Sequence, residues 1–207
     1  MEILTPRKYT KAKRQAAAEA LRQRILEATL RLHAEKGIFG TSWKDIAQQA
    51  DVSLATVYNY FPSLDELVPA CGELIDAITR PPSLEDSPMI FAGARSLKAR
   101  LGRLVSALFD FYERGAPYLE TDYQERKLAS VQAWEAHLKA TIEGLTRAAL
   151  EPVQPDERAV QTVSALLDFR VFMAFQRRGL PKGEVDLVIS RMLLGWIRQS
   201  NGRRQNR

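Results

Sequence analysis

Apolar residues recur at intervals of three and four along nearly the whole chain, and this spacing limits the available folds more than any other feature. Leu21, Ile25, Ala28 and Leu32 form one such stripe. No segment alternates apolar and polar residues over any length, as a half-buried strand would. We therefore predict an all-α protein. The predicted helical segments span residues 12–36, 41–50, 54–60, 64–79, 92–114, 117–132, 133–150, 156–178 and 182–200.

Residues 80–92 contain three prolines and two serines, so we expect no regular helix there. The break predicts a small N-terminal unit and a larger C-terminal one. We assign 1–68 to the first domain, with a basic arm over 1–14, and 69–202 to the second. Residues 203–207 form a basic tail.

Charge is concentrated at the ends of the chain. Residues 1–44 hold ten Lys or Arg and four Asp or Glu, whereas residues 45–202 carry a net charge of −4. Localised positive charge suits a polyanion such as DNA. Lys8, Lys11, Lys13 and Arg14 are candidates for contacts with the phosphate backbone or the minor groove; the alternative is a solvated terminus.

Several classes of function receive no support from the sequence. No apolar run approaches the roughly 18 residues of a membrane span, and the polar N-terminus is unlike a secretory signal. One cysteine, Cys71, and two histidines make a zinc site improbable and favour the reducing cytoplasm. No nucleophile elbow, phosphate loop or metalloprotease motif occurs. We therefore expect no enzyme, cofactor, metal or membrane partner.

The most informative stretch is residues 41–61, TSWKDIAQQADVSLATVYNYF. Ser42 and Asp45 have the spacing of a capping box, and Ser53 can cap the next helix. Asp51 stands in the turn between them, where a residue must tolerate positive φ. Ala47 permits a close helix crossing. This pattern predicts a helix-turn-helix. Its core comprises Ile46, Ala50, Val52 and Val57, covered by Ile25, Ala28, Leu32 and Phe39.

The third predicted helix carries too many polar groups to bury them all. Hydroxyls and amides on a short helix can meet base edges and phosphates in the major groove. Asn59 suits adenine, and Leu54 or Ala55 suits a thymine methyl. Ser42 and Lys44 are placed to meet a phosphate. The alternative is an ordinary three-helix bundle with a polar face. The candidate DNA-binding residues from this pattern are Ser42, Lys44, Ser53, Leu54, Ala55, Thr56, Asn59 and Tyr60.

Residues 20–67 resemble the TetR family of bacterial transcription regulators, above all in the run VSLATVYNYFPSLDEL. The resemblance implies an N-terminal helix-turn-helix domain and a C-terminal helical domain for ligand binding and dimerisation. By analogy, Thr56, Tyr58 and Tyr60 meet DNA, flanked by Ser42, Trp43 and Lys44. Two residues depart from the family pattern: Leu64 replaces a phosphate-contacting Lys, and Asp51 replaces Gly.

The C-terminal half suggests a dimer and a ligand pocket. The segments 163–175 and 182–200 are apolar enough to form a four-helix interface, with a monomer as the alternative. Candidate interface residues are Leu166, Val171, Phe175, Val185, Val188, Ile189, Met192 and Trp196. Candidate ligand-binding residues are Phe109, Tyr112, Tyr118, Tyr123, Trp134, His137, Leu138, Phe169, Phe172 and Met173, with plain core packing as the alternative. The roles of Asp168 and Arg170 stay open.

Together these observations predict a cytoplasmic, homodimeric regulator that binds double-stranded DNA at a near-palindromic operator. Its two reading helices would lie about 34 Å apart, or a multiple of this. We expect a repressor released by a small, mostly apolar inducer. The alternative is a helical ligand- or protein-binding module that keeps the fold but has weak or lost operator binding, which Leu64 and Asp51 favour.

Overall fold

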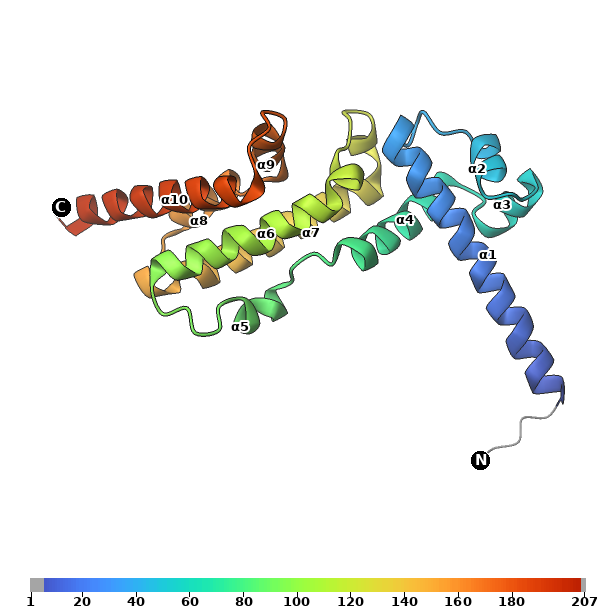
Figure 1. Cartoon of the computed structure of the whole chain (residues 1–207), viewed down its shortest axis with the longest axis horizontal. Helices are drawn as coiled ribbons and strands as arrows, with labels where there is room; N and C mark the ends of the chain where they lie inside the picture. The colour runs from blue at the N-terminus through green and yellow to red at the C-terminus, as the bar shows by residue number, and fades with distance from the viewer. Residues whose placement is uncertain (1–5, 206–207) are drawn as a thin grey trace. The chain divides into compact units, whose positions relative to one another are not determined.

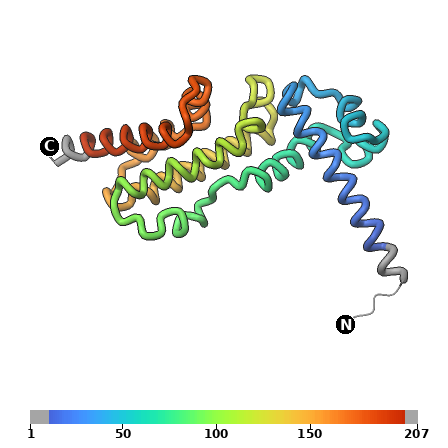
Figure 2. The backbone as a smooth tube through the Cα atoms, viewed as in Figure 1, coloured from blue at the N-terminus to red at the C-terminus, as the bar shows by residue number. Residues whose placement is uncertain are grey.

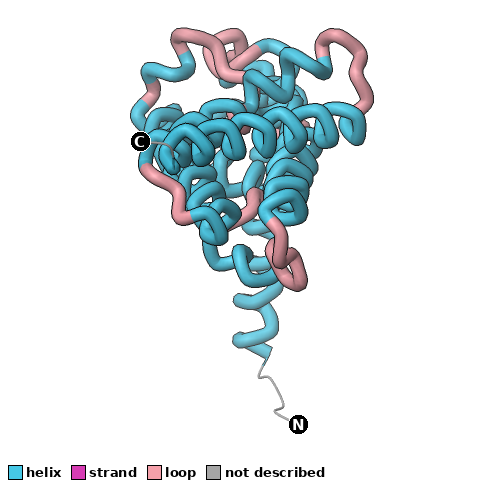
Figure 3. Tube along the Cα trace, turned by 90° about the vertical axis from the view of Figure 1, so that its left-hand side faces the viewer, coloured by secondary structure: helices cyan, strands magenta, loops and turns pink. Residues whose placement is uncertain are grey.

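The computed structural model describes the backbone of residues 6–205 and the side chains of residues 11–200. All regular structure in this range is helical, as Figure 3 shows. The α-helices are α1 (Pro6–Lys36), α2 (Trp43–Gln49), α3 (Leu54–Tyr60), α4 (Leu64–Thr79), α5 (Ser87–Ile90), α6 (Leu97–Leu119), α7 (Ala129–Leu150), α8 (Glu157–Leu166), α9 (Phe169–Gln176) and α10 (Lys182–Gln205). Three short 3₁₀ turns lie at Leu84–Asp86, Glu125–Lys127 and Glu151–Val153. The predicted all-α class is confirmed.

The chain divides into two compact units. The first comprises residues up to Ile75 together with Thr121–Val131, and the second comprises Asp76–Glu120 with everything from Gln132 onward. The segment between α6 and α7 thus belongs to the first unit, a feature that no sequence pattern indicated. Figures 1 and 2 trace the order of the helices within each unit. No helix in the described part of the chain combines the length and apolar character that a bilayer crossing requires.

The core of the first unit lies where α1, α2, α3 and α4 meet. Ile25, Ile46, Val57 and Leu67 are each at most 2% exposed. The predicted role of Phe39 in this core is wrong, because its side chain is 54% exposed in the loop after α1. Phe61, at the end of α3, is buried instead. A residue close to a helix in sequence can still point away from it when a glycine-containing loop reverses the chain.

Helix α6 organises the second unit. Its apolar side, including Leu101, Leu104, Leu108 and Phe109, is fully buried, and α10 packs along it. The interruption that we predicted at Gly115 and Pro117 does not occur, since α6 continues to Leu119. A Cβ on Gly115 would lie 2.7 Å from Leu119 Cδ1 and 3.3 Å from Thr79 Cγ2, so this glycine allows a close approach rather than a break. Pro117 lies in the last turn, where losing one amide costs little.

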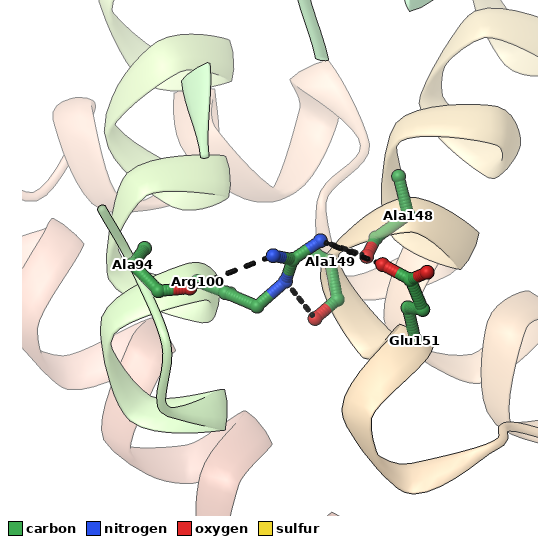
Figure 4. A network of polar contacts seen from close by, with 5 residues as sticks. All are labelled: Ala94, Arg100, Ala148, Ala149 and Glu151. Carbon is green, nitrogen blue, oxygen red and sulfur yellow. Dashed lines mark hydrogen bonds and ion pairs between the residues drawn. The ribbon is translucent and has the colours of Figure 1, made fainter. Parts of the chain in front are cut away.

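Three arginines of α6 bind the exposed carbonyls at the ends of other helices. Arg100 donates to the Ala148 and Ala149 carbonyls of α7 at 2.7 and 3.2 Å and pairs with Glu151 at 3.3 Å, as Figure 4 shows. Arg114 donates to the Thr79 carbonyl at 2.8 Å. The third arginine, Arg103, donates to the carbonyl of Ile90, the last residue of α5, and to that of Ala92. Helix C-termini leave their last carbonyls without intrahelical partners, so these guanidinium groups complete three helix ends.

The prediction of a single helix over 156–178 is wrong, because the helix is interrupted at Leu167 and Asp168, between α8 and α9. Asp168 is the N-cap of α9, and its carboxylate accepts the Arg170 amide at 2.8 Å. The hydroxyl of Tyr112 donates to the Leu167 carbonyl at 2.8 Å. Arg170 is exposed and lies 3.9 Å from Glu135. The charges that interrupt this apolar run therefore mark a helix boundary.

Candidate nucleic-acid interface

Local capping sets the start of α2. Ser42 Oγ accepts the Asp45 amide at 3.1 Å, and Asp45 Oδ2 accepts the Ser42 amide at 3.2 Å. This confirms the predicted capping box. The hydrogen bond from the Ser42 amide, assisted by the Ser42 side chain and by Lys36 at 3.6 Å, holds the pKa of Asp45 below its usual value. The carboxylate that fixes the start of α2 therefore stays ionised at neutral pH.

The turn between α2 and α3 has the backbone conformation that we predicted for it. Asp51 has φ 52°, in the left-handed region, and the Val52 amide donates to the Ala47 carbonyl at 3.0 Å. Ala47 is 5% exposed at the crossing of the two helices. Arg24 of α1 reaches the Asp51 carbonyl at 3.4 Å, so α1 supports the turn directly. These contacts fix the angle at which α3 leaves α2.

Helix α3 begins at a serine that serves its backbone. Ser53 Oγ accepts the Thr56 amide at 3.1 Å and lies 2.8 Å from Thr56 Oγ1. The two hydroxyls thus orient one another at the start of the helix. Val57 is the buried residue of α3, with no exposed surface. The rest of this short helix turns outward.

All the predicted DNA-contacting residues lie on the surface or at its edge. Leu54 and Tyr58 are each 43% exposed. The rings of Tyr58 and Trp43 lie 5.0 Å apart with an interplanar angle of 30°, so the first residue of α2 braces a side chain of α3. The exposed members of the set are Ser42, Lys44, Ser53, Leu54, Ala55, Tyr58 and Asn59, and the partly exposed ones are Trp43, Thr56 and Tyr60.

We call this set of exposed and partly exposed residues the reading face; it excludes the buried Val57. A B-DNA major groove about 12 Å wide accepts one α-helix of about 10–12 Å in diameter. Hydroxyls, an amide and two tyrosines on α3 can then donate to or accept from base edges and phosphates. Lys44 brings positive charge to one end of the face, whereas the carboxylate of Asp51 is exposed at the turn. The reading face has the donors of a nucleic-acid interface and little charge of its own.

A buried carboxylate, that of Glu125, lies beside the loop that follows the C-terminus of α1. Glu125, 4% exposed, accepts the Ile38 amide at 2.6 Å and the Asp122 amide at 2.8 Å. Gly37, directly after α1, has φ 75°, in the left-handed region that favours glycine, and a Cβ there would lie 2.8 Å from Glu125 Oε1. The sequence pattern indicated a solvated acidic face comprising Glu113, Glu120, Asp122 and Glu125. For Glu125 this prediction is wrong, because its carboxylate is buried against an amide 87 residues away in sequence.

Four of the predicted ligand-binding residues contact one another. Phe109, Tyr112, Phe169 and Phe172 form an aromatic cluster in the second unit, with ring centroids 5.2–6.5 Å apart. Burial raises the pKa of the Tyr112 hydroxyl far above its usual value. Among the other candidates, Tyr118, Leu138 and Met173 are half-buried, the Trp134 indole donates to Asp76, and His137 is exposed. Tyr123 is 75% exposed and belongs to the first unit.

The predicted interface residues separate into two sets. Val185 and Ile189 are 0% and 3% exposed, so they pack within the chain. They form the inner stripe of α10 with Leu193 and Ile197. Val188 and Met192 lie on its outer side, 39% and 57% exposed. The other candidates, Leu166, Val171, Phe175 and Trp196, are half-buried. Within the described residues, no cluster of three or more His, Cys, Asp or Glu could hold a metal.

Residues 25–71, which include α2 and α3, match the family model described as bacterial regulatory proteins, tetR family. The helix-turn-helix segment of the chain belongs to this family. A regulator named BetI from Burkholderia cenocepacia is 32% identical over 108 residues, which are 50% of this chain and 52% of that protein. The chain thus spans about half the length of this curated relative.

Solved structures of TetR-like proteins share the fold over most of the chain. A TetR-family transcriptional regulator from Streptomyces coelicolor covers 89% of this chain, and 83% of its own chain is matched, with a TM-score of 0.63 and 21% identity. The regulator FadR from Bacillus subtilis, in complex with stearoyl-CoA, covers 83% of this chain, and 96% of its own chain is matched, with a TM-score of 0.59 and 15% identity. At such identities the likeness concerns the fold.

Proposed function

We propose that this chain regulates transcription by binding double-stranded DNA as a homodimer, without catalytic activity, in the cytoplasm where chromosomal DNA lies. The observation that carries the proposal is the reading face: a capped seven-residue helix in a helix-turn-helix, whose Ser, Tyr and Asn side chains point outward and whose one buried residue is Val57. Polar groups held this way suit base edges and phosphates.

Fluorescence anisotropy with duplex DNA from upstream of the chain's own gene tests the proposal. We expect binding that weakens steeply as salt rises, because phosphate contacts release counterions. Tyr58→Ala should lower the affinity by about 5-fold to 150-fold, since each good base contact contributes about 1–3 kcal/mol. Tyr123→Ala is the matched control, an exposed tyrosine outside the reading face. Salt-independent binding, or equal affinity of both variants, would instead support a module of the same fold that has lost operator binding.

Dimerisation through α10 is part of the proposal. Its inner stripe packs within the chain, while Leu187, Val188 and Met192 leave an apolar outer side. An exposed apolar surface on a long helix favours association with a second copy, and a two-fold dimer can place two reading faces on one duplex. Sedimentation equilibrium should give a dimer for the wild type and a monomer for Val188→Glu/Met192→Glu. The control Lys98→Glu, on an exposed site of α6, should remain dimeric.

Release by a small, mostly apolar ligand is the third element, and it makes the chain a repressor. The support is the aromatic cluster of Phe109, Tyr112, Phe169 and Phe172, together with the stearoyl-CoA bound to the FadR structure of similar fold. A ligand shifts DNA binding only if it prefers one conformation of the protein. Stearoyl-CoA, added to the protein–DNA complex, should lower anisotropy, and Phe172→Leu should weaken this response. No change in anisotropy across acyl-CoA chain lengths would exclude this class of ligand.

A further inference from the structure

The N-terminal part of α1 is a free-standing basic helix. Residues 11–20 are all exposed, although they are helical and continuous with the buried part of α1. Figure 1 shows this end of α1 extending beyond α2 and α3. The predicted basic arm is therefore helical from Pro6 onward; residues 1–5 and the side chain of Lys8 lie outside the described part of the structure. At about 1.5 Å per residue, residues 6–20 extend roughly 20 Å.

The composition of this helix explains why it forms without packing. Residues 11–20, KAKRQAAAEA, consist only of Ala, Lys, Arg, Gln and Glu, the strongest helix formers. No side chain larger than alanine is apolar, so the segment has no hydrophobic anchor for a protein groove. It has three basic residues and one acid, Glu19. The chemistry of this surface fits a polyanion.

Helical periodicity gives the basic residues a direction. At about 100° per residue, Arg14 lies on the same face of α1 as Leu21, Ile25 and Leu32, which follow it by 7, 11 and 18 residues. Ile25 and Leu32 are buried against the helix-turn-helix. Lys11 and Lys13 lie on either side of Arg14, about 60° and about 100° around the helix axis. The face that supports α3 thus continues, beyond α3, as a basic surface.

Two contacts fix where this surface begins. The Arg24 guanidinium reaches the Asp51 carbonyl before α3, and the Arg22 guanidinium lies 5.4 Å from the ring of Phe61 after α3. Arg22 and Arg24 of α1 therefore contact the residues that flank the two ends of α3. The free helix leads away from this point with its basic side turned the same way.

We propose that Lys11, Lys13 and Arg14 bind DNA phosphates beside the groove that α3 enters, so that each subunit contacts flanking duplex as well as its half-site. The inference rests on the proposed DNA-binding function. A helix about 10–12 Å wide does not fit a minor groove about 6 Å wide, so the contacts are to phosphates and carry no base readout. The reading face has little positive charge, because Asp51 places an acid at the turn before α3 and Leu64 is uncharged at the start of α4. The basic helix supplies the positive charge that is missing there.

The test compares the wild type with Lys11→Gln/Lys13→Gln/Arg14→Gln, whose glutamines preserve helix propensity. Hydroxyl-radical footprinting on DNA from upstream of the chain's own gene first locates the bound site. Affinities are then measured on two duplexes, one trimmed to the half-sites and one with about ten further base pairs on each side, since the free helix spans roughly 20 Å. The control variant, Arg95→Gln/Lys98→Gln/Arg158→Gln, removes the same charge from exposed positions of the second unit.

On the long duplex we expect the triple variant to bind at least tenfold more weakly than the wild type. The slope of log K against log salt should fall by about 2–3 per subunit, since each lost phosphate contact removes roughly 0.9. On the trimmed duplex the two proteins should bind alike. Equal affinity and slope on the long duplex would overturn the inference while leaving the proposed function intact. A wild type that binds neither duplex would overturn both.

Discussion

Replacing Glu125 with alanine should destabilise the first unit far more than a loop substitution normally does. The carboxylate is 4% exposed and accepts two backbone amides, those of Ile38 at 2.6 Å and Asp122 at 2.8 Å. A hydrogen bond to a charged group contributes about 1.5–3 kcal/mol, and a buried donor left unpaired costs a similar amount. Because water can enter the vacated space in part, we expect a loss of about 2–4 kcal/mol.

Urea titration followed by circular dichroism measures this loss. For a chain of this size, each kcal/mol corresponds to roughly 2–4 °C in Tm, so thermal melts should show a decrease of about 4–16 °C. Glu125→Gln keeps one acceptor oxygen but turns an NH₂ group toward the second amide, so its loss should be intermediate. Glu113→Ala, an exposed acid on α6, is the control and should stay within about 0.5 kcal/mol of wild type. A Glu125→Ala protein as stable as that control would refute the assigned role of the carboxylate.

Three further predictions concern single side chains. Burial lowers the pKa of His33 from 6.5 to about 4, so between these pH values the unfolded chain binds a proton that the folded chain excludes. The free energy of unfolding should therefore fall by up to ~3 kcal/mol as pH drops from 6.5 to 4. His33→Leu should abolish this part of the pH dependence in urea titrations. Arg100→Ala should lower the free energy of unfolding by about 2–4 kcal/mol, because the Ala148 and Ala149 carbonyls lose their donor, and an unchanged Tm would contradict this. Burial raises the pKa of the Cys71 thiol to about 12, so Ellman's reagent at pH about 8 should label it only after denaturation, and rapid labelling of the native protein would show that the thiol is accessible.

Local signals predicted the helix-turn-helix well because its caps and turns depend on neighbouring residues. The Ser42–Asp45 capping box, the positive φ of Asp51 and the bounds of α3 all follow from interactions within four residues. The face of α3 opposite Val57 could be assigned from its polar residues alone. These are the elements in which propensity, capping and apolar spacing agree.

The errors arose where distant contacts decide the outcome. Gly115 stays helical because the end of α4 packs against it, which nothing in its own neighbourhood indicates. Asp168 ends one helix and caps another, because a polar residue in an apolar run can serve the backbone as well as a pocket. The position of Glu125 depends on a partner 87 residues away in sequence. The dimer, the inducer and the contacts of the reading face stay predictions.

Regulators with this architecture invite modular engineering, in which a DNA-reading half is joined to a foreign sensor. The location of Thr121–Val131 limits that strategy here, since this stretch from the middle of the chain belongs to the first unit. A chimaera cut after Ile75 would leave behind the acid that covers the Ile38 amide. A chimaera built on residues up to Ile75 must therefore include a loop that replaces Thr121–Val131. Without such a loop, the Ile38 amide has no carboxylate to accept its hydrogen bond.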